Sequence, residues 1–130
     1  MVQSFRDLQV WQRSIQLSVS VYQLTKGFSC EEIYGLTSQM RRSAVSVAGN
    51  IAEGHGRLST GEYRQFLGVA QGSNFELQTQ LEIARALKFG DAVTIAEAEG
   101  LSFEVGKMIA GLLNAIKDKG AGKPALTPNP

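Results

Sequence analysis

Apolar positions recur along this chain at spacings of three and four residues. Over residues 33–51 the repeat consists of Ile33, Leu36, Met40, Ala44, Val47 and Ile51. This spacing keeps the side chains on one face of a helix. Similar stripes run through residues 63–84 and 95–116, and no stretch has the strict alternation that is typical of a half-buried strand. The pattern therefore predicts an all-α protein.

Two capping boxes predict where the second and third helices begin. Each consists of a serine followed three residues later by a glutamate, in the segments SCEE (29–32) and STGE (59–62). Apolar residues flank both boxes and predict hydrophobic staples, between Phe28 and Ile33 and between Leu58 and Tyr63.

The remaining boundaries follow from polar caps and glycines. Ser4 or Asp7 can cap a first helix that ends near Thr25, the third helix ends at Gly90, and Asp91 caps a fourth that runs to about Lys119. Short connections favour antiparallel neighbours. We predict an antiparallel up-down-up-down four-helix bundle over residues 1–119 and a flexible tail over residues 120–130, which are rich in glycine and proline.

The first helix is apolar on two sides. One stripe contains Leu8, Trp11, Ile15, Val19 and Tyr22, and the other contains Val10, Leu17, Val21 and Leu24. A helix of this kind needs packing partners on both of its apolar sides. Small residues also repeat every four positions, as in Ala92, Ala96 and Gly100, and Gly49 predicts close packing or a kink. The two apolar stripes and the repeat of small residues favour a homo-oligomer, although close packing within one monomer is the alternative.

A polar line lies beside the apolar stripe of the second helix. It contains Gln39, Ser43, Ser46, Asn50, Glu53 and Arg57, and Ser73 and Glu76 share a face of the third helix. We predict a structural polar network of Gln39, Ser46, Asn50, Glu53, Ser73 and Glu76 that fixes helix register. A hydrolase that uses Glu53 and Glu76 as its acid and base is the least favoured alternative.

Composition narrows the candidate chemistry. Thirteen Lys and Arg against twelve Asp and Glu give a net charge of +1, so a basic binding site must be local. The one histidine, His55, has Ala52 three residues before it, so the Glu-x-x-His pairs of di-iron bundles are missing. We expect no metal, cofactor or catalytic residue. We expect a surface or hydrogen-bonding role for His55, with a ligand or acid/base role as the alternative, and ordinary packing at a helix cap for Cys30, with a lowered thiol pKa as the alternative. The lone cysteine and the lack of a signal peptide or membrane-spanning stretch favour the cytoplasm.

Four arginines gather in sequence around the predicted turn between the second and third helices: Arg41, Arg42, Arg57 and Arg64. They are candidate contacts to nucleic acid, and an oligomer would repeat them several times. The alternative is that they form a solvated face with salt bridges.

The segment QMRRSAVSVAGNIAEG over residues 39–54 resembles a known family, the four-helix-bundle proteins encoded by intervening sequences of bacterial 23S ribosomal RNA genes. Other residues fit the family pattern too: Phe5 to Leu8, Val10, Trp11, Arg57, Ser59, Glu62, Phe66, Leu67, Ala70, Gly72, Ser73, Glu76, Leu77 and Gln80.

The resemblance implies an antiparallel four-helix bundle that assembles into a homopentamer, with no established enzymatic activity. It also implies a relation to accessory proteins of diversity-generating retroelements, which bind a reverse transcriptase and nucleic acid through a basic surface. Our first hypothesis is a non-enzymatic oligomeric bundle that binds RNA, DNA or a nucleoprotein as an accessory. The alternative is a protein-protein interaction scaffold that does not bind nucleic acid.

Overall fold

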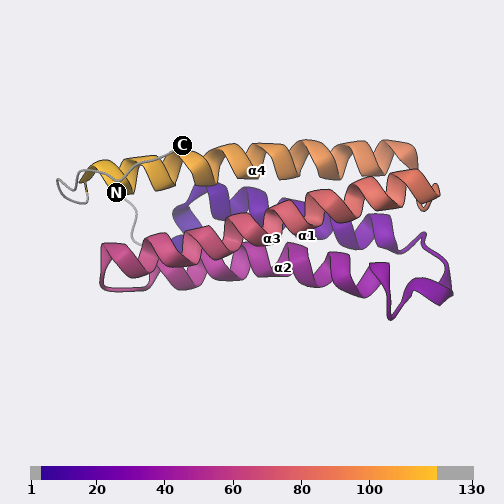
Figure 1. The fold of residues 1–130 in the computed structure, drawn as a ribbon, viewed down its shortest axis with the longest axis horizontal. Coiled ribbons are helices and arrows are strands. Elements are labelled where there is room, and N and C mark those ends of the chain that lie inside the picture. The colour runs from indigo at the N-terminus through magenta and orange to yellow at the C-terminus, as the bar shows by residue number, and fades with distance from the viewer. Residues whose placement is uncertain (1–3, 120–130) are drawn as a thin grey trace.

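Four long helices lie side by side along the longest axis of the molecule (Figure 1). The computed structural model describes residues 4–119. The helices are α1 (Gln9–Thr25), α2 (Leu36–His55), α3 (Thr60–Leu87) and α4 (Ala92–Lys119), with the one-turn 3-10 helices η1 (Phe5–Asp7) and η2 (Cys30–Glu32) before α1 and α2. The predicted all-α four-helix bundle is confirmed. The predicted tail over residues 120–130 lies outside the described residues.

Each helix packs on two others, so the bundle is square in section. α1 and α3 both contact α2 and α4. Side-chain contacts give the directions of the chains: residue numbers that rise along α3 from Gln71 to Asn74 fall along α4 from Gly106 to Ser102. Ser46 of α2 likewise meets Ser73 of α3, and Gly54 meets Phe66. These neighbouring helices therefore run antiparallel.

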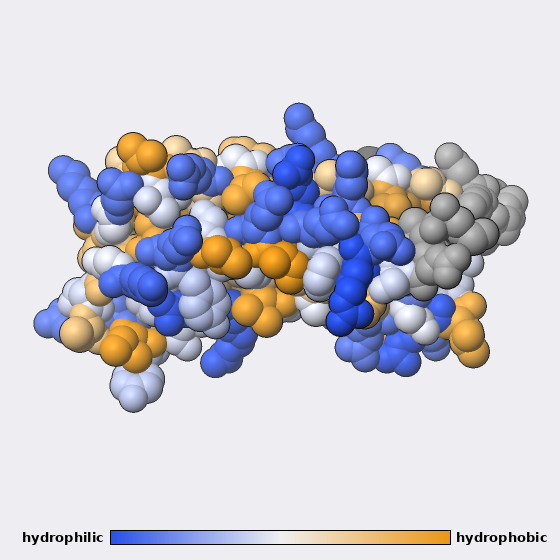
Figure 2. All heavy atoms as spheres, turned by 180° about the vertical axis from the view of Figure 1, so that it is seen from behind, coloured by the Kyte–Doolittle hydropathy of each residue, from blue (hydrophilic) through white to orange (hydrophobic). Residues whose placement is uncertain are grey.

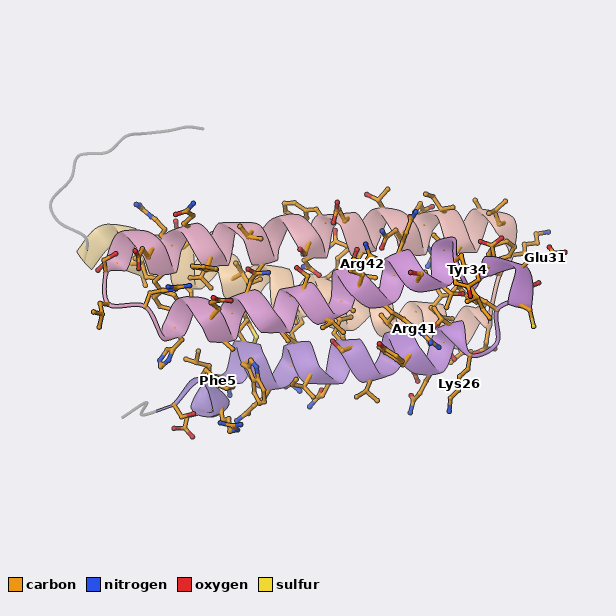
Figure 3. All side chains as sticks on the ribbon, turned by 90° about the horizontal axis from the view of Figure 1, so that it is seen from below. Phe5, Lys26, Glu31, Tyr34, Arg41 and Arg42 are labelled. Carbon is orange, nitrogen blue, oxygen red and sulfur yellow. The ribbon has the colours of Figure 1, made fainter. Side chains whose placement is uncertain are left out.

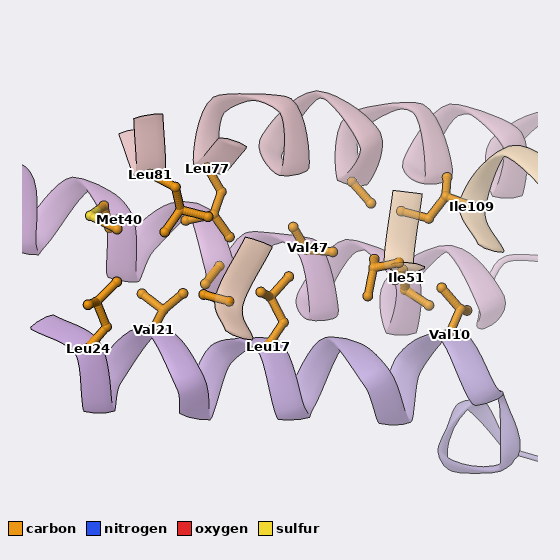
Figure 4. Close-up of a cluster of buried hydrophobic side chains, with 14 of the residues drawn as sticks. Val10, Leu17, Val21, Leu24, Met40, Val47, Ile51, Leu77, Leu81 and Ile109 are labelled. Carbon is orange, nitrogen blue, oxygen red and sulfur yellow. The ribbon is translucent and has the colours of Figure 1, made fainter. Parts of the chain in front are cut away.

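The core is built from the inner stripes of the four helices (Figure 4). Leu17 and Val21 of α1 are fully buried, and the same buried cluster includes Met40, Val47, Ile51, Leu77, Leu81 and Ile109 from the other helices. Burying one such aliphatic side chain stabilises the fold by roughly 1.5 to 3 kcal/mol. The three-and-four spacing in the sequence thus identifies the residues that hold the bundle together.

Side-chain caps start α3 and α4 as predicted. The Oγ of Ser59 accepts a hydrogen bond from the Glu62 backbone N–H at 3.1 Å, and a carboxylate oxygen of Asp91 accepts one from the Thr94 N–H at 2.9 Å. Each bond satisfies a backbone donor that has no partner within the helix.

The predicted start of the second helix is wrong by several residues. Ser29 does accept a hydrogen bond, from the Glu31 N–H at 3.2 Å, but the turn it caps is the short η2. The chain then bends at Gly35, and Glu32 Oε1 accepts a hydrogen bond from the Leu36 N–H at 3.2 Å. The glutamate of the predicted box therefore caps the following helix instead of closing its own turn.

The predicted hydrophobic staple between Leu58 and Tyr63 does not form. Leu58 is fully exposed and Ile33 is about half exposed, at 49%. Tyr34, next to Ile33, is 96% exposed. Exposed apolar side chains therefore lie near both ends of α2.

The structure differs from the predictions at two further positions. α3 ends at Leu87 because Lys88 takes the left-handed conformation (φ 61°), and Gly90 (φ 73°) forms the turn that follows. A β-carbon on Gly90 would lie 2.8 Å from Leu24, so this turn packs tightly on the end of α1. Gly49, by contrast, has nothing within 4 Å of its β-carbon position, so the predicted close packing does not occur within the chain.

Candidate interaction surfaces

The four candidate arginines fall into two pairs at opposite ends of α2. Arg41 and Arg42 lie in its first third, whereas Arg57 and Arg64 lie at the turn into α3. The separation along the helix is about 20 Å at 1.5 Å per residue. The four arginines therefore do not form one continuous basic patch on a single chain.

Arg41 is held against α1, and Arg42 is exposed (Figure 3). The Nε of Arg41 donates to Thr25 Oγ1 at 2.8 Å, and its guanidinium lies 4.4 Å from the centre of the Tyr22 ring. Arg42 lines a groove on the same face but forms no hydrogen bond or ion pair with the residues that the structure describes. Arg42 is thus the cation of this pair that is free to meet a partner.

The second pair lies at the α2/α3 turn. Arg57 forms an ion pair with Glu53 at 2.8 Å and lies over the Phe66 ring at 4.8 Å. Arg64 is half-buried and has no ion-pair partner among the described side chains. One of the two charges is therefore already neutralised on the surface.

The structure links three of the six residues predicted to form a polar network. The hydroxyls of Ser46 and Ser73 lie 2.8 Å apart between α2 and α3, and Asn50 Nδ2 donates to the Ser46 carbonyl at 2.8 Å and hydroxyl at 3.0 Å. Gln39, Glu53 and Glu76 lie on the exposed side. These three side chains are exposed because they lie on the parts of α2 and α3 that face away from the contact between the two helices.

A second polar contact, which was not predicted, lies deeper in the bundle. Asn74 of α3 and Ser102 of α4 are both fully buried and bond to each other. Gln71 Nε2 also donates to the Gly106 carbonyl, at 3.1 Å. The sequence held a signal for this contact, since Asn74 interrupts an apolar stripe, but the stripe does not indicate which residue of α4 it meets.

Three grooves run between neighbouring helices. The α1/α4 groove encloses about 700 Å³ and is lined by Ile15, Gln16, Val19, Ser20, Gln23, Ala96, Glu97, Gly100, Leu101 and Glu104. The α1/α2 groove encloses about 500 Å³ and is lined by Tyr22, Ile33, Thr37, Ser38, Arg41, Arg42 and Val45. The α3/α4 groove, of about 520 Å³, includes Phe75, Ile83 and Phe103. Figure 2 shows the face that contains α1, with hydrophobic side chains near its middle.

A few acid and base groups on the surface are paired. The guanidinium of Arg85 bonds to Glu99 and to Glu82, and the hydrogen bond to Arg85 lowers the pKa of Glu99. Burial raises the pKa of Tyr63, whose ring meets that of His55 edge to face at 6.0 Å. Cys30 is exposed. Within the described part of the chain, no three His, Cys, Asp or Glu side chains gather as metal ligands would.

The comparisons with known proteins agree with this fold. The family model described as 23S rRNA-intervening sequence protein matches residues 6–111. A solved structure of a protein of unknown function from the S23 ribosomal protein family of Bacteroides thetaiotaomicron superimposes with a TM-score of 0.72 at 19% identity, covering 80% of this chain and 97% of that chain. No curated protein matches.

None of the described helices is both long and apolar enough to cross a membrane.

Proposed function

We propose that this chain, which belongs to the family of 23S rRNA-intervening sequence proteins, acts as a non-enzymatic interaction module that works as a homo-oligomer. The expected assembly is the homopentamer that the sequence resemblance implies. Its partner would bind to a surface that the assembled oligomer displays.

The outer stripe of α1 carries this proposal. Ile15, Val19 and Tyr22 are 38%, 51% and 43% exposed, although the opposite side of the same helix is buried in the core. Phe75 and Phe103 add two half-exposed rings on the α3/α4 side. Groups of exposed apolar side chains of this kind are typical of interaction surfaces.

A substitution in this stripe tests the proposal. Val19→Glu places a charge on the outer side of α1 without touching the core, and Gln65→Glu makes a matched change at an exposed position of α3. We expect Val19→Glu to shift the protein to a smaller assembly in light scattering after size exclusion, and Gln65→Glu to leave the mass unchanged. An equal mass for both variants would count against an interface at α1.

The positions of the two acids support the non-enzymatic part of the proposal. Glu53 is held by Arg57 and its side chain is 55% exposed, and Glu76 is exposed on α3.

Nucleic-acid binding is a second candidate, favoured by the free cations Arg42 and Arg64. Tyr22 lines the same groove as Arg42 and is 43% exposed, so its ring is one on which a base could stack. An oligomer would repeat each cation, and closely spaced cations raise the affinity for a polyanion. In this case the partner would be RNA, DNA or a nucleoprotein, as for the accessory proteins of retroelements that the family resembles.

A further inference from the structure

We infer that the α1/α2 groove of one copy packs on the α1/α4 groove of the next, with Arg42 facing Glu97 across the contact. The inference rests on the proposed homo-oligomer and names the two surfaces that build it. The occupant of each groove is therefore a second copy of this chain.

The two grooves have complementary charges. Arg41 and Arg42 are the charged residues of the α1/α2 groove, and Glu97 and Glu104 are those of the α1/α4 groove. Arg41 is engaged by Thr25, and Glu104 by Arg13 at 2.9 Å. Arg42 and Glu97 remain exposed and unpaired among the described residues. Complementary charges of this kind set the register of an interface.

Apolar side chains surround the charges on both surfaces. Ile33 and Val45 are 49% and 50% exposed in the α1/α2 groove, and Val19 is 51% exposed beside Leu101 in the α1/α4 groove. An apolar centre with a few charges at its rim is the usual composition of a stable interface.

Each groove also contains a buried hydroxyl without a hydrogen bond. Ser20 lines the α1/α4 groove and is 8% exposed, and Thr37 lines the α1/α2 groove and is 7% exposed. Neither Oγ has a partner within the described chain. Buried polar groups are nearly always bonded, so these two hydroxyls indicate surfaces at which the isolated chain is incomplete.

The position of the grooves around the bundle favours a closed ring. Both include α1, so they lie on adjacent faces of a square bundle, roughly 90° apart. Contact faces 90° apart close a ring of four copies and faces about 108° apart close a ring of five, whereas opposite faces would produce an open filament. Pairing the α1/α2 groove with the α3/α4 groove would use opposite faces. The acids of that groove, Glu82 and Glu99, are in any case both bonded to Arg85.

The two charges also lie at similar heights along the bundle. Arg41, next to Arg42, bonds to Thr25 of α1, and Glu97 lies with Ser20 and Gln23 in its groove. These α1 positions differ by at most five residues, or about 8 Å of rise. In a ring of parallel bundles, contacting groups must share a height, and long side chains span a difference of this size.

This arrangement covers α1 from both sides. Each copy would contribute α1 to two contacts, one with each neighbour. The outer stripe with Val19 would lie between these two contacts, on the side of the bundle that faces the centre of the ring. The second apolar stripe of the first helix would then be covered by other copies of the same chain.

A charge exchange tests the inference. We expect Arg42→Glu and Glu97→Arg each to raise the dissociation constant of the oligomer at least tenfold, as measured by sedimentation at low salt. In the double variant, the dissociation constant should lie within threefold of that of the unmodified protein. Lys88→Glu and Glu76→Arg, at exposed positions outside both grooves, are the matched controls and should change the constant less than twofold.

A cross-linking variant covers the case in which the exchanged charges disturb folding. In a Cys30→Ser background, Arg42→Cys combined with Glu97→Cys should give disulfide-linked oligomers under mild oxidation, and either cysteine alone should not. A stable oligomer that neither responds to the exchange nor cross-links would overturn this inference alone. A monomeric unmodified protein would overturn the proposed homo-oligomer together with it.

Discussion

Asn74 and Ser102 bond to each other twice across the α3/α4 contact. Asn74 Nδ2 donates to the Ser102 carbonyl at 2.9 Å, and Ser102 Oγ donates to Asn74 Oδ1 at 2.7 Å. Both residues are fully buried, so water cannot replace a lost partner.

Removing either partner should therefore destabilise the bundle. We expect Asn74→Ala to lower the free energy of unfolding by about 3 kcal/mol, because it leaves the Ser102 groups unpaired and opens a cavity. Ser102→Ala should cost about 1 to 2 kcal/mol. Denaturant titration at one fixed protein concentration measures both values. A loss below about 1 kcal/mol for Asn74→Ala would contradict a paired, dry contact.

Two glycines should respond in opposite directions to alanine. A β-carbon at Gly54 would lie 2.7 Å from the Phe66 β-carbon, so Gly54→Ala must push α2 and α3 apart. At Gly72, an exposed position inside α3, nothing lies within 4 Å of the β-carbon position. We expect Gly72→Ala to stabilise the protein by up to about 1 kcal/mol and Gly54→Ala to destabilise it, as thermal unfolding would show. If both substitutions changed the stability in the same direction, the close spacing of α2 and α3 at Gly54 would be contradicted.

Asp91 should give a pH-dependent contribution to stability. The Thr94 hydroxyl and backbone N–H hydrogen-bond its carboxylate and lower its pKa below the ordinary value of 3.8. Since the folded pKa is the lower one, the stabilisation is fully present above the unfolded value and is lost as the pH falls through the folded value.

Asp91→Ala tests this sign directly. Its melting temperature should lie below that of the unmodified protein at pH 7, and the difference should shrink as the pH falls towards about 3. A difference that stays constant with pH would show that the carboxylate charge does not matter at this cap.

Nucleic-acid binding, if it occurs, should depend on salt. We expect single-stranded RNA to bind at low salt with an affinity that falls steeply as salt rises, and Arg64→Glu to weaken binding several-fold. Gln65→Glu, on the next residue, is the control. Fluorescence anisotropy measures both, and a lack of RNA and DNA retention at low salt would remove this candidate function.

The architecture could be predicted from the sequence because helix spacing and caps are local signals. The inner stripe with Met40 and Ile51 packs as its spacing indicates, and Ser59 and Asp91 cap the helices they precede. The box at Ser29 failed because its serine caps a short turn in place of a long helix, and its glutamate accepts from the Leu36 N–H instead. A local motif does not indicate which of the two forms, since the choice depends on where Gly35 bends the chain.

The surface could be predicted only in part. The two apolar stripes of α1 were visible in the sequence, but their division into a core side and an outer side with Val19 depends on where α2 and α4 lie. Arg42 and Arg57 look clustered in sequence because they flank one turn, yet α2 holds them at opposite ends. Long-range placement of this kind requires the packed structure.

The mass of the unmodified protein in solution tests the central claim most directly. Native mass spectrometry at low micromolar concentration should find a closed homo-oligomer, with five times the mass of the single chain as the expected species. A single-chain mass that persists as the protein is concentrated would contradict the account, because the outer stripe of α1 would then be exposed to water without a partner.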